Sequence, residues 1–212
     1  MTKRKLYLQN ALLLTASGLV LRMLGMGFRV VLSAFLGGEG MGLYQLILSL
    51  YMVFVSLATA GMNVASTRLA AQSLARGQGM AATLRGLCTA ALAFGTLAMV
   101  AQAVLAGPAA RYLLHDARAE TALRILAPSL PFMAVSGTLR GCFLASRRVT
   151  PNVVTQLIEQ LVRMAVAVAG LRVMAQWGAG YGCAAVVLGN TVSEGVSCIP
   201  VSYTHLRAHE TL

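Results

Sequence analysis

Two arginines interrupt an apolar stretch near the start of the chain. Arg22 and Arg29 lie within GLVLRMLGMGFRVVLSAFLG, residues 18–37, a stretch long enough to cross a bilayer as a helix. An arginine at the bilayer centre costs about 2.5–3.5 kcal/mol on insertion scales, so it persists where it faces protein or water. The seven-residue spacing puts both guanidinium groups on one helical stripe. The stripe indicates a binding surface for an anion; the alternative is that one arginine snorkels to the headgroups.

A second polar face occurs in the segment QLIEQLVRMAVAVAG. Gln156, Glu159, Gln160 and Arg163 occupy positions i, i+3, i+4 and i+7 of an otherwise apolar helix. Glu159 and Arg163 have the order and spacing of an i, i+4 ion pair. Such a polar face is not expected to be exposed to lipid. It either lines a polar cavity or neutralises itself while joining helices.

Arg140 lies in a segment that begins with two prolines. Pro128 and Pro131, three residues apart, are expected to break or kink this helix, and transporters tolerate such breaks where backbone lines a cavity or gate. Arg140 is either part of that cavity or part of the basic cluster with Arg147 and Arg148, about two turns away.

The intramembrane arginines outnumber their acidic partners on this interpretation. Arg22, Arg29, Arg140 and Arg163 face Glu159 alone, an excess of three positive charges. Glu194, the other acid in an apolar run, is expected near the cytoplasmic end of its helix. We therefore predict a water-filled, positively charged cavity that attracts phosphate or carboxylate.

The elements that would position these residues are membrane-spanning helices. Hydrophobic residues make up 58% of the chain and charged residues only 11%, against about 25% charged in soluble proteins. Continuous apolar runs, without the alternation of barrel strands, predict an all-α integral membrane protein. About six transmembrane helices are expected, at residues 6–36, 43–66, 84–106, 122–145, 153–175 and 180–199.

The basic residues indicate orientation rather than nucleic-acid binding, despite a net charge of +11. Eight lysines and arginines lie at the N-terminus and in the connections after the second and fourth helices, against three on the opposite side. The positive-inside rule predicts a multi-pass protein of the cell membrane, in contact with membrane lipid, with both ends of this chain in the cytoplasm.

Residues 1–200 are expected to form one helical lobe, and residues 201–212 a non-native tail. The tail, VSYTHLRAHETL, resembles sequencing-adapter read-through and is not expected to continue the helix before it. Its His205 and His209 lack a third ligand, so no metal site is predicted. The first apolar run is too long for a cleavable signal peptide, and four scattered cysteines favour packing over chemistry.

Three segments resemble a known transporter family. They are GLVLRMLGMGFRVVLSAFLGGEGMGLYQLILSLYMVFVSLATAG, RGCF and TPNVVTQLIEQLVRM, in that order. The chain is similar to the stage V sporulation protein B and polysaccharide-exporter branch of the MOP flippase superfamily over nearly all of residues 1–200. The resemblance implies a MATE-like fold of about fourteen helices in two lobes, of which this chain supplies the first and lacks the C-terminal one. Relatives commonly have a proline where this chain has Asn63.

The same resemblance implies a flippase for lipid-linked, pyrophosphate-bearing sugar precursors, without a cofactor. Arg22 and Arg29 match its cavity arginines, and Arg140, Glu159, Gln160 and Arg163 match further positions of its pattern. A cation-coupled multidrug antiporter of the MATE type is the alternative, although the first helix lacks the acidic residue that coupling needs. An enzyme is not expected: the only acid–base cluster, His115, Asp116 and Glu120, lies beside arginines and is better explained as a solvated loop.

Overall fold

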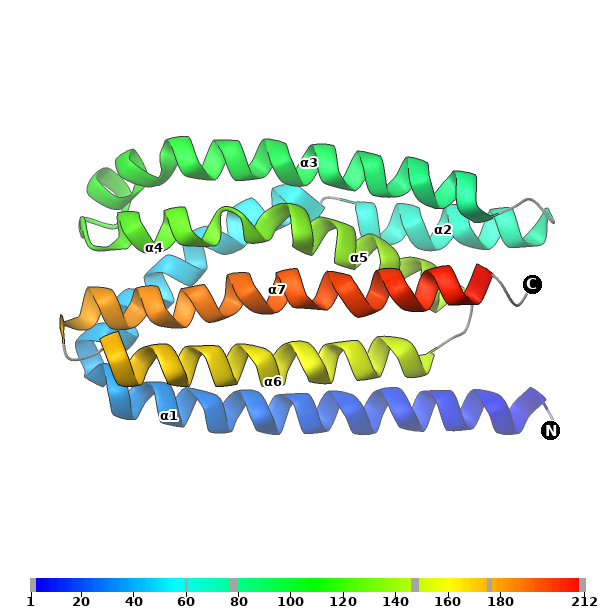
Figure 1. Cartoon of the computed structure of the whole chain (residues 1–212), viewed down its shortest axis with the longest axis horizontal. Coiled ribbons are helices and arrows are strands. Elements are labelled where there is room, and N and C mark those ends of the chain that lie inside the picture. Colours follow the sequence, from blue (N-terminus) through cyan, green and yellow to red (C-terminus); the bar gives the residue numbers. More distant parts are fainter. Residues whose placement is uncertain (1–2, 60, 77–79, 146–148, 175–176, 210–212) are drawn as a thin grey trace.

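The regular structure is entirely helical in the part of the chain that the computed structural model describes, residues 3–59, 61–76, 80–145, 149–174 and 177–209 (Figure 1). This confirms the all-α prediction. The elements are, in chain order, α1 (Lys3–Thr59), α2 (Met62–Ala75), α3 (Met80–Pro108), the π-helix η1 (Ala109–Leu113), α4 (Ala119–Leu126), α5 (Ser129–Ala145), α6 (Val149–Met174) and α7 (Ala179–His209).

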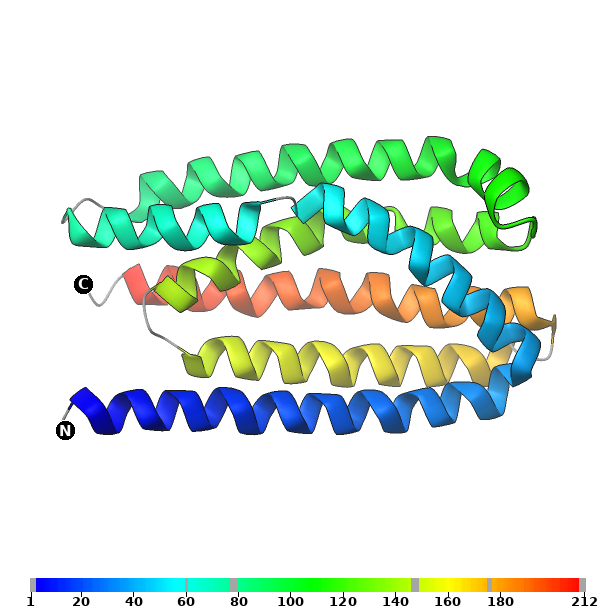
Figure 2. The ribbon, with the colours of Figure 1, turned by 180° about the vertical axis from the view of Figure 1, so that it is seen from behind.

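Helix α1 consists of two limbs joined by a sharp bend. Gly37 has φ +65° and ψ −174°, a backbone conformation outside the helical region that L side chains rarely adopt. The first limb, residues 3–36, runs the length of the molecule, and the second limb, residues 38–59, returns across it (Figures 1 and 2). The two helices predicted at 6–36 and 43–66 are therefore connected by a bend without an intervening loop.

A second glycine divides the predicted helix 43–66. Gly61, with φ +69°, separates α1 from α2. Asn63 occupies the position where a proline was expected from the family resemblance, so the break here depends on glycine rather than on proline.

The prolines break the predicted helix 122–145 into α4 and α5, whose axes differ by 41°. Pro128 falls between the two helices, and Pro131 lies in the first turn of α5, where the missing N–H is tolerated. This confirms the expected kink.

The break leaves backbone carbonyls that water cannot satisfy inside a membrane. Side chains from neighbouring helices donate to carbonyls at this break: Thr191 Oγ1 of α7 donates to the Ile125 carbonyl at 2.8 Å, and Gln102 Nε2 of α3 donates at 2.7 Å to the Leu123 carbonyl, which also accepts from the Ala127 N–H. Ser129 Oγ donates to the Leu126 carbonyl at 2.6 Å.

Tyr51 of the second α1 limb fixes the same break from a third side. Its hydroxyl lies 2.7 Å from Ser129 Oγ, and its side chain is buried. The bend between α4 and α5 is therefore held by α1, α3 and α7 together.

The helix ends gather at the two ends of the long axis. The start of α1, the end of α2, the start of α3 and the end of α7 lie at one end, and the Gly37 bend, η1 and the start of α7 lie at the other (Figures 1 and 2). Among the described basic residues, Arg76 follows the end of α2 and Arg85 lies near the start of α3, while Arg111 lies in η1 and Arg118 directly before α4. The orientation in the membrane stays a prediction.

The surface of the helices is apolar. Among the side chains that are more than 60% exposed are Leu19, Met23, Met26, Val30, Val53, Val64, Leu97 and Val104. Exposed aliphatic side chains in such numbers fit a lipid environment rather than water.

Two helical stretches among the described residues are long and apolar enough to cross a membrane, residues 12–73 and 82–113. The bent pair 119–126 and 129–143 makes a third if it forms one span. The first stretch has 62 residues, which would measure roughly 93 Å as a straight helix against about 30 Å of hydrocarbon, so it crosses more than once when bent at Gly37. The count of six spans stays a prediction.

Small residues allow the helices to approach closely, as in other membrane bundles. An added Cβ at Gly141 of α5 would lie 2.2 Å from Ser66 Oγ of α2, and one at Gly189 of α7 would lie 3.0 Å from the Arg163 carbonyl of α6. The fully buried large side chains between the helices are mostly aliphatic and include Leu32, Ile47, Leu123, Leu126, Leu130 and Leu171.

Helix α7 continues beyond its predicted end. It was expected to stop near residue 199, but the helix runs through Pro200 to His209. The expectation that residues 201–212 do not continue the helix was therefore wrong as far as His209. Whether those residues are foreign to the protein stays a prediction.

Candidate functional site

A cavity of about 250 Å³ lies between both limbs of α1 and helices α5, α6 and α7. The first limb contributes residues around Arg29, the second limb contributes Tyr44 and Tyr51, and α5 contributes Met133. The other polar side chains in its wall are Gln160 and Arg163 of α6 and Asn190 and Glu194 of α7. The cavity is thus the place where the two polar segments found in the sequence meet.

Arg29 and Arg22 differ in their relation to this cavity. Both are exposed on the first limb, but Arg29 belongs to the cavity wall and Arg22 does not. No carboxylate among the described side chains forms an ion pair with either arginine. Arg29 therefore offers an uncompensated positive charge at the cavity, and a binding role for Arg22 stays a prediction.

The predicted Glu159–Arg163 pair forms and is part of a larger network. Arg163 Nη2 lies 2.7 Å from Glu159 Oε1, and Arg140 Nη2 of α5 donates to Glu159 Oε2. Arg163 Nη2 also lies 3.6 Å from Glu194 Oε1 of α7. We call Arg140, Glu159, Arg163 and Glu194 the charge network; it joins three helices.

The network corrects the charge count made from the sequence. Glu194 was placed near the cytoplasmic end of its helix, but it lies beside Arg163 and lines the cavity. Two carboxylates therefore oppose the four arginines, so the excess is two positive charges rather than three. Arg140 binds Glu159 inside the lobe; the basic cluster that was its alternative position, Arg147 and Arg148, lies outside the described residues.

Burial makes this network sensitive to the loss of any one member. The Glu159 side chain is 10% exposed and the Glu194 side chain 6%. A buried carboxylate left without its cation is strongly unfavourable, and so is a buried guanidinium left without its carboxylate.

The two glutamines of the predicted polar face have different positions. Gln160 adds an amide to the cavity wall, while Gln156 donates to Asn152 Oδ1 at 3.1 Å.

Sequence reasoning missed Tyr44, Tyr51, Asn190 and the inward position of Glu194. Glu194 carried a usable signal, because an acid within an apolar run requires a cation nearby. The two tyrosines carried none, since tyrosine is common at positions of many kinds in membrane helices.

The acidic residues in and beside the connection between η1 and α4 form ion pairs with arginines. Arg118 Nη2 lies 2.8 Å from Asp116 Oδ2, and Arg118 Nη1 lies 2.8 Å from Glu39 Oε1, just beyond the Gly37 bend. Glu120 lies 2.8 Å from Arg124 and 3.8 Å from Arg111. This pairing supports the solvated-loop interpretation over an acid–base site.

Hydrogen bonds from Arg118 hold the pKa of Asp116 below its usual value, and hydrogen bonds to Asp116 and Glu39 raise that of Arg118. Both groups are therefore charged over the whole neutral range.

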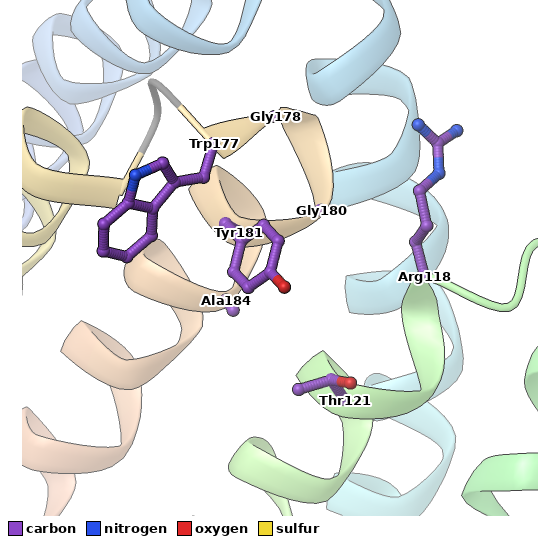
Figure 3. Close-up of a pocket in the computed structure, with 7 residues that line it drawn as sticks. All are labelled: Arg118, Thr121, Trp177, Gly178, Gly180, Tyr181 and Ala184. Carbon is purple, nitrogen blue, oxygen red and sulfur yellow. The ribbon is translucent and has the colours of Figure 1, made fainter.

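A second hollow, of about 450 Å³, lies at this end between the starts of α4 and α7 (Figure 3). Trp177 and Tyr181 lie edge to face with ring centroids 6.1 Å apart. Figure 3 shows the Arg118 guanidinium directed away from both rings. The exposed rings fit the aromatic belt of a membrane interface, and Arg118 is already bound to carboxylates, so this hollow is a weaker candidate for an anion site.

The sequence comparisons agree with these features. A family model described as polysaccharide biosynthesis protein matches residues 7–207. The chain belongs to this family. The match reaches residue 207, seven residues into the predicted tail.

Two relatives from Bacillus subtilis strain 168 place the chain within the MOP flippase superfamily. Stage V sporulation protein B is 30% identical over 204 residues, which are 92% of this chain and 38% of the relative. Lipid II flippase MurJ is 24% identical over 168 residues, 74% of this chain and 31% of the relative. No solved structure matches.

The chain spans about a third of the length of these relatives, 38% and 31%. One of the two relatives is named as a lipid II flippase, and neither is named as an enzyme. The comparisons agree with the expectation that this chain is not an enzyme.

Proposed function

We propose that this chain is the N-terminal lobe of a flippase that translocates lipid-linked, diphosphate-bearing sugar precursors for peptidoglycan or polysaccharide synthesis. The observation that carries the proposal is Arg29: it lines the cavity and has no carboxylate partner among the described side chains. A guanidinium in that situation favours a bound anion.

The chemistry of the cavity suits a phosphate-bearing head. Arginine binds phosphate through two parallel hydrogen bonds, and such charge-assisted bonds are about twice as strong as neutral ones. Arg29 approaches from α1, and Arg163 approaches from α6 with the amide of Gln160. The anion would therefore be held from two helices that are distant in sequence.

The size of the cavity limits what it holds. About 250 Å³ is smaller than the roughly 300–1,000 Å³ of sites that enclose a whole small-molecule ligand. We therefore assign only the phosphate groups to the cavity, while the sugar and the polyprenyl chain lie outside it.

Translocation by alternating access requires a second lobe that moves relative to this one. The proposed partner is the C-terminal lobe of the same protein, and rocking of the two lobes would open the cavity to each side in turn. The bends at Gly37, at Gly61 and between α4 and α5 divide the helices into segments that such a motion can shift.

A cation-coupled multidrug antiporter is the second candidate. Glu194 favours it, because a buried carboxylate in a cavity wall can bind a proton or a cation. Against it, the described polar groups that the first limb gives to the cavity are basic rather than acidic.

Binding of a polyprenyl diphosphate sugar to the purified chain in nanodiscs of neutral lipid tests the proposal. Arg29→Ala is expected to weaken binding by about tenfold to a hundredfold, the loss of a charged hydrogen-bond partner worth about 1.5–3 kcal/mol. Arg85→Ala is the matched control: it removes the same charge from an exposed position of α3 outside the cavity and should change binding less than about twofold.

Equal affinity of the wild type and Arg29→Ala would contradict the assignment of the cavity. Arg22→Ala decides whether the predicted stripe takes part, because a loss comparable with that of Arg29→Ala would place the ligand along both arginines. Proton- or sodium-driven drug efflux by the whole protein, without diphosphate binding, would favour the antiporter.

A further inference from the structure

Two buried carboxyl groups share one guanidinium beside the cavity. Glu159 Oε1 and Glu194 Oε1 both approach Arg163 Nη2, at 2.7 and 3.6 Å. The two acids come from different helices, α6 and α7. Like charges that share a site oppose each other's ionisation, so such a pair takes up and releases protons as a unit.

The two carboxylates differ in their position relative to the cavity. Glu159 receives hydrogen bonds from Arg140 and Arg163, and Glu194 Oε1 lies 3.6 Å from Arg163 Nη2. Glu194 is the one of the two that lines the cavity. Of the pair, Glu194 is therefore the group that can change its protonation state with the contents of the cavity.

The charged and titratable groups around Glu194 come from α1, α5 and α6, while α4, which also packs against α7, contributes none to the cavity wall. They are Arg29 with the hydroxyls of Tyr44 and Tyr51 on α1, Arg140 on α5, and Glu159 and Arg163 on α6. In the empty cavity Arg163 supports a negative charge on Glu194. An anion that binds Arg163 together with Arg29 reduces this support and adds its own negative charge, so the ionised form of Glu194 becomes less favourable.

We propose that Glu194 is a proton-binding site coupled to the anion site, so that an anion bound by Arg29 and Arg163 loads one proton onto the Glu194 carboxylate. The proton comes from water through the cavity that Glu194 lines, and it forms an O–H bond on the carboxylate; no bond of the ligand is made or broken. Release of the anion returns the proton. The coupling of proton binding to anion binding rests on the proposed function.

The consequence is an anion affinity that depends on pH. Binding with uptake of about one proton makes the dissociation constant rise by up to about tenfold for each pH unit increase. A pH difference between the two sides of the membrane would then favour binding on the acidic side and release on the other.

Calorimetry in buffers of different ionisation enthalpy measures the protons taken up on binding. The probe is a polyprenyl diphosphate sugar, a diphosphate diester whose own phosphates do not titrate near neutral pH. The wild-type chain is expected to take up about one proton per ligand, and Glu194→Gln about none while still binding. Glu120→Gln, in the first turn of α4 and outside the cavity wall, is the matched control and should keep the uptake of the wild type.

Infrared spectroscopy of the wild-type chain provides a readout that does not depend on the variant folding. Ligand addition should produce the C=O stretch of a protonated carboxyl group. Binding without proton uptake and without this band overturns the inference and leaves the proposed function standing. Absence of binding at every pH overturns both.

Discussion

Gly95 of α3 lies directly against the backbone of Pro131 at the start of α5. A Cβ atom at position 95 would lie 2.6 Å from Pro131 Cα and 3.1 Å from the Leu130 carbonyl oxygen. Both neighbours are backbone atoms and cannot rotate away. The close approach of α3 to the helix break between α4 and α5 therefore requires glycine at this position.

Gly95→Ala is expected to destabilise the lobe by about 1–3 kcal/mol, the usual effect of overpacking. Gly86→Ala on the same helix is the control, because a Cβ there meets nothing within 4 Å. Detergent-dependent unfolding measured by circular dichroism distinguishes the two. Equal stability of both variants would mean that α3 and α5 can move apart without lowering the stability of the lobe.

Gly37 is required for its backbone conformation rather than for space. A Cβ there would meet nothing within 4 Å, but its φ of +65° is unfavourable for any L side chain. Gly37→Ala should therefore destabilise the lobe by about 1–2 kcal/mol. Gly38→Ala, one residue away and also without a nearby atom, should leave stability unchanged or raise it. Thermal unfolding of the two variants compares them, and a neutral Gly37→Ala would show that the bend tolerates another conformation.

The helices and the i, i+4 pair could be predicted because they depend on local pattern. Apolar runs locate helices, and the spacing of Glu159 and Arg163 placed them side by side, as found. Pro128 likewise marked the break between α4 and α5.

Contacts between distant segments could not be predicted in this way. Arg140 reaches Glu159 from α5 and Glu194 reaches Arg163 from α7, and no spacing rule relates these positions. The difference between Arg22 and Arg29 has the same origin: both lie on one stripe, but the path of the second α1 limb, set by Gly37, decides which of them meets the cavity.

Removing Glu159 should be more harmful than removing a surface acid. Glu159→Gln leaves Arg140 and Arg163 facing each other across a largely buried site. We therefore expect the free energy of unfolding to fall by about 3–5 kcal/mol. Glu120→Gln removes an acid whose arginine partners are exposed and should change stability by less than about 1 kcal/mol. Chemical unfolding in mixed micelles gives both values.

A double-mutant cycle separates the network from simple loss of packing. Arg140→Met in the Glu159→Gln background should be less harmful than Arg140→Met alone, with a coupling energy of about 0.5–3 kcal/mol. Strict additivity of the two substitutions would show that Arg140 and Glu159 do not stabilise one another.

The connection between η1 and α4 should loosen at acid pH because the pKa of Asp116 is lowered by Arg118. A carboxyl group with a lowered folded-state pKa contributes stability above its unfolded pKa of about 3.9, and this contribution is lost as the pH falls through the lower folded-state value. The transition therefore lies below about pH 4. Trp177, the single tryptophan of the chain, lines the same hollow as Arg118, so its fluorescence should report the change. Asp116→Asn should show at neutral pH the fluorescence that the wild type shows at acid pH, while Glu120→Gln should retain the wild-type transition. If the transition persists in Asp116→Asn, another carboxyl group causes it, and Glu39, which also binds Arg118, is the first to test.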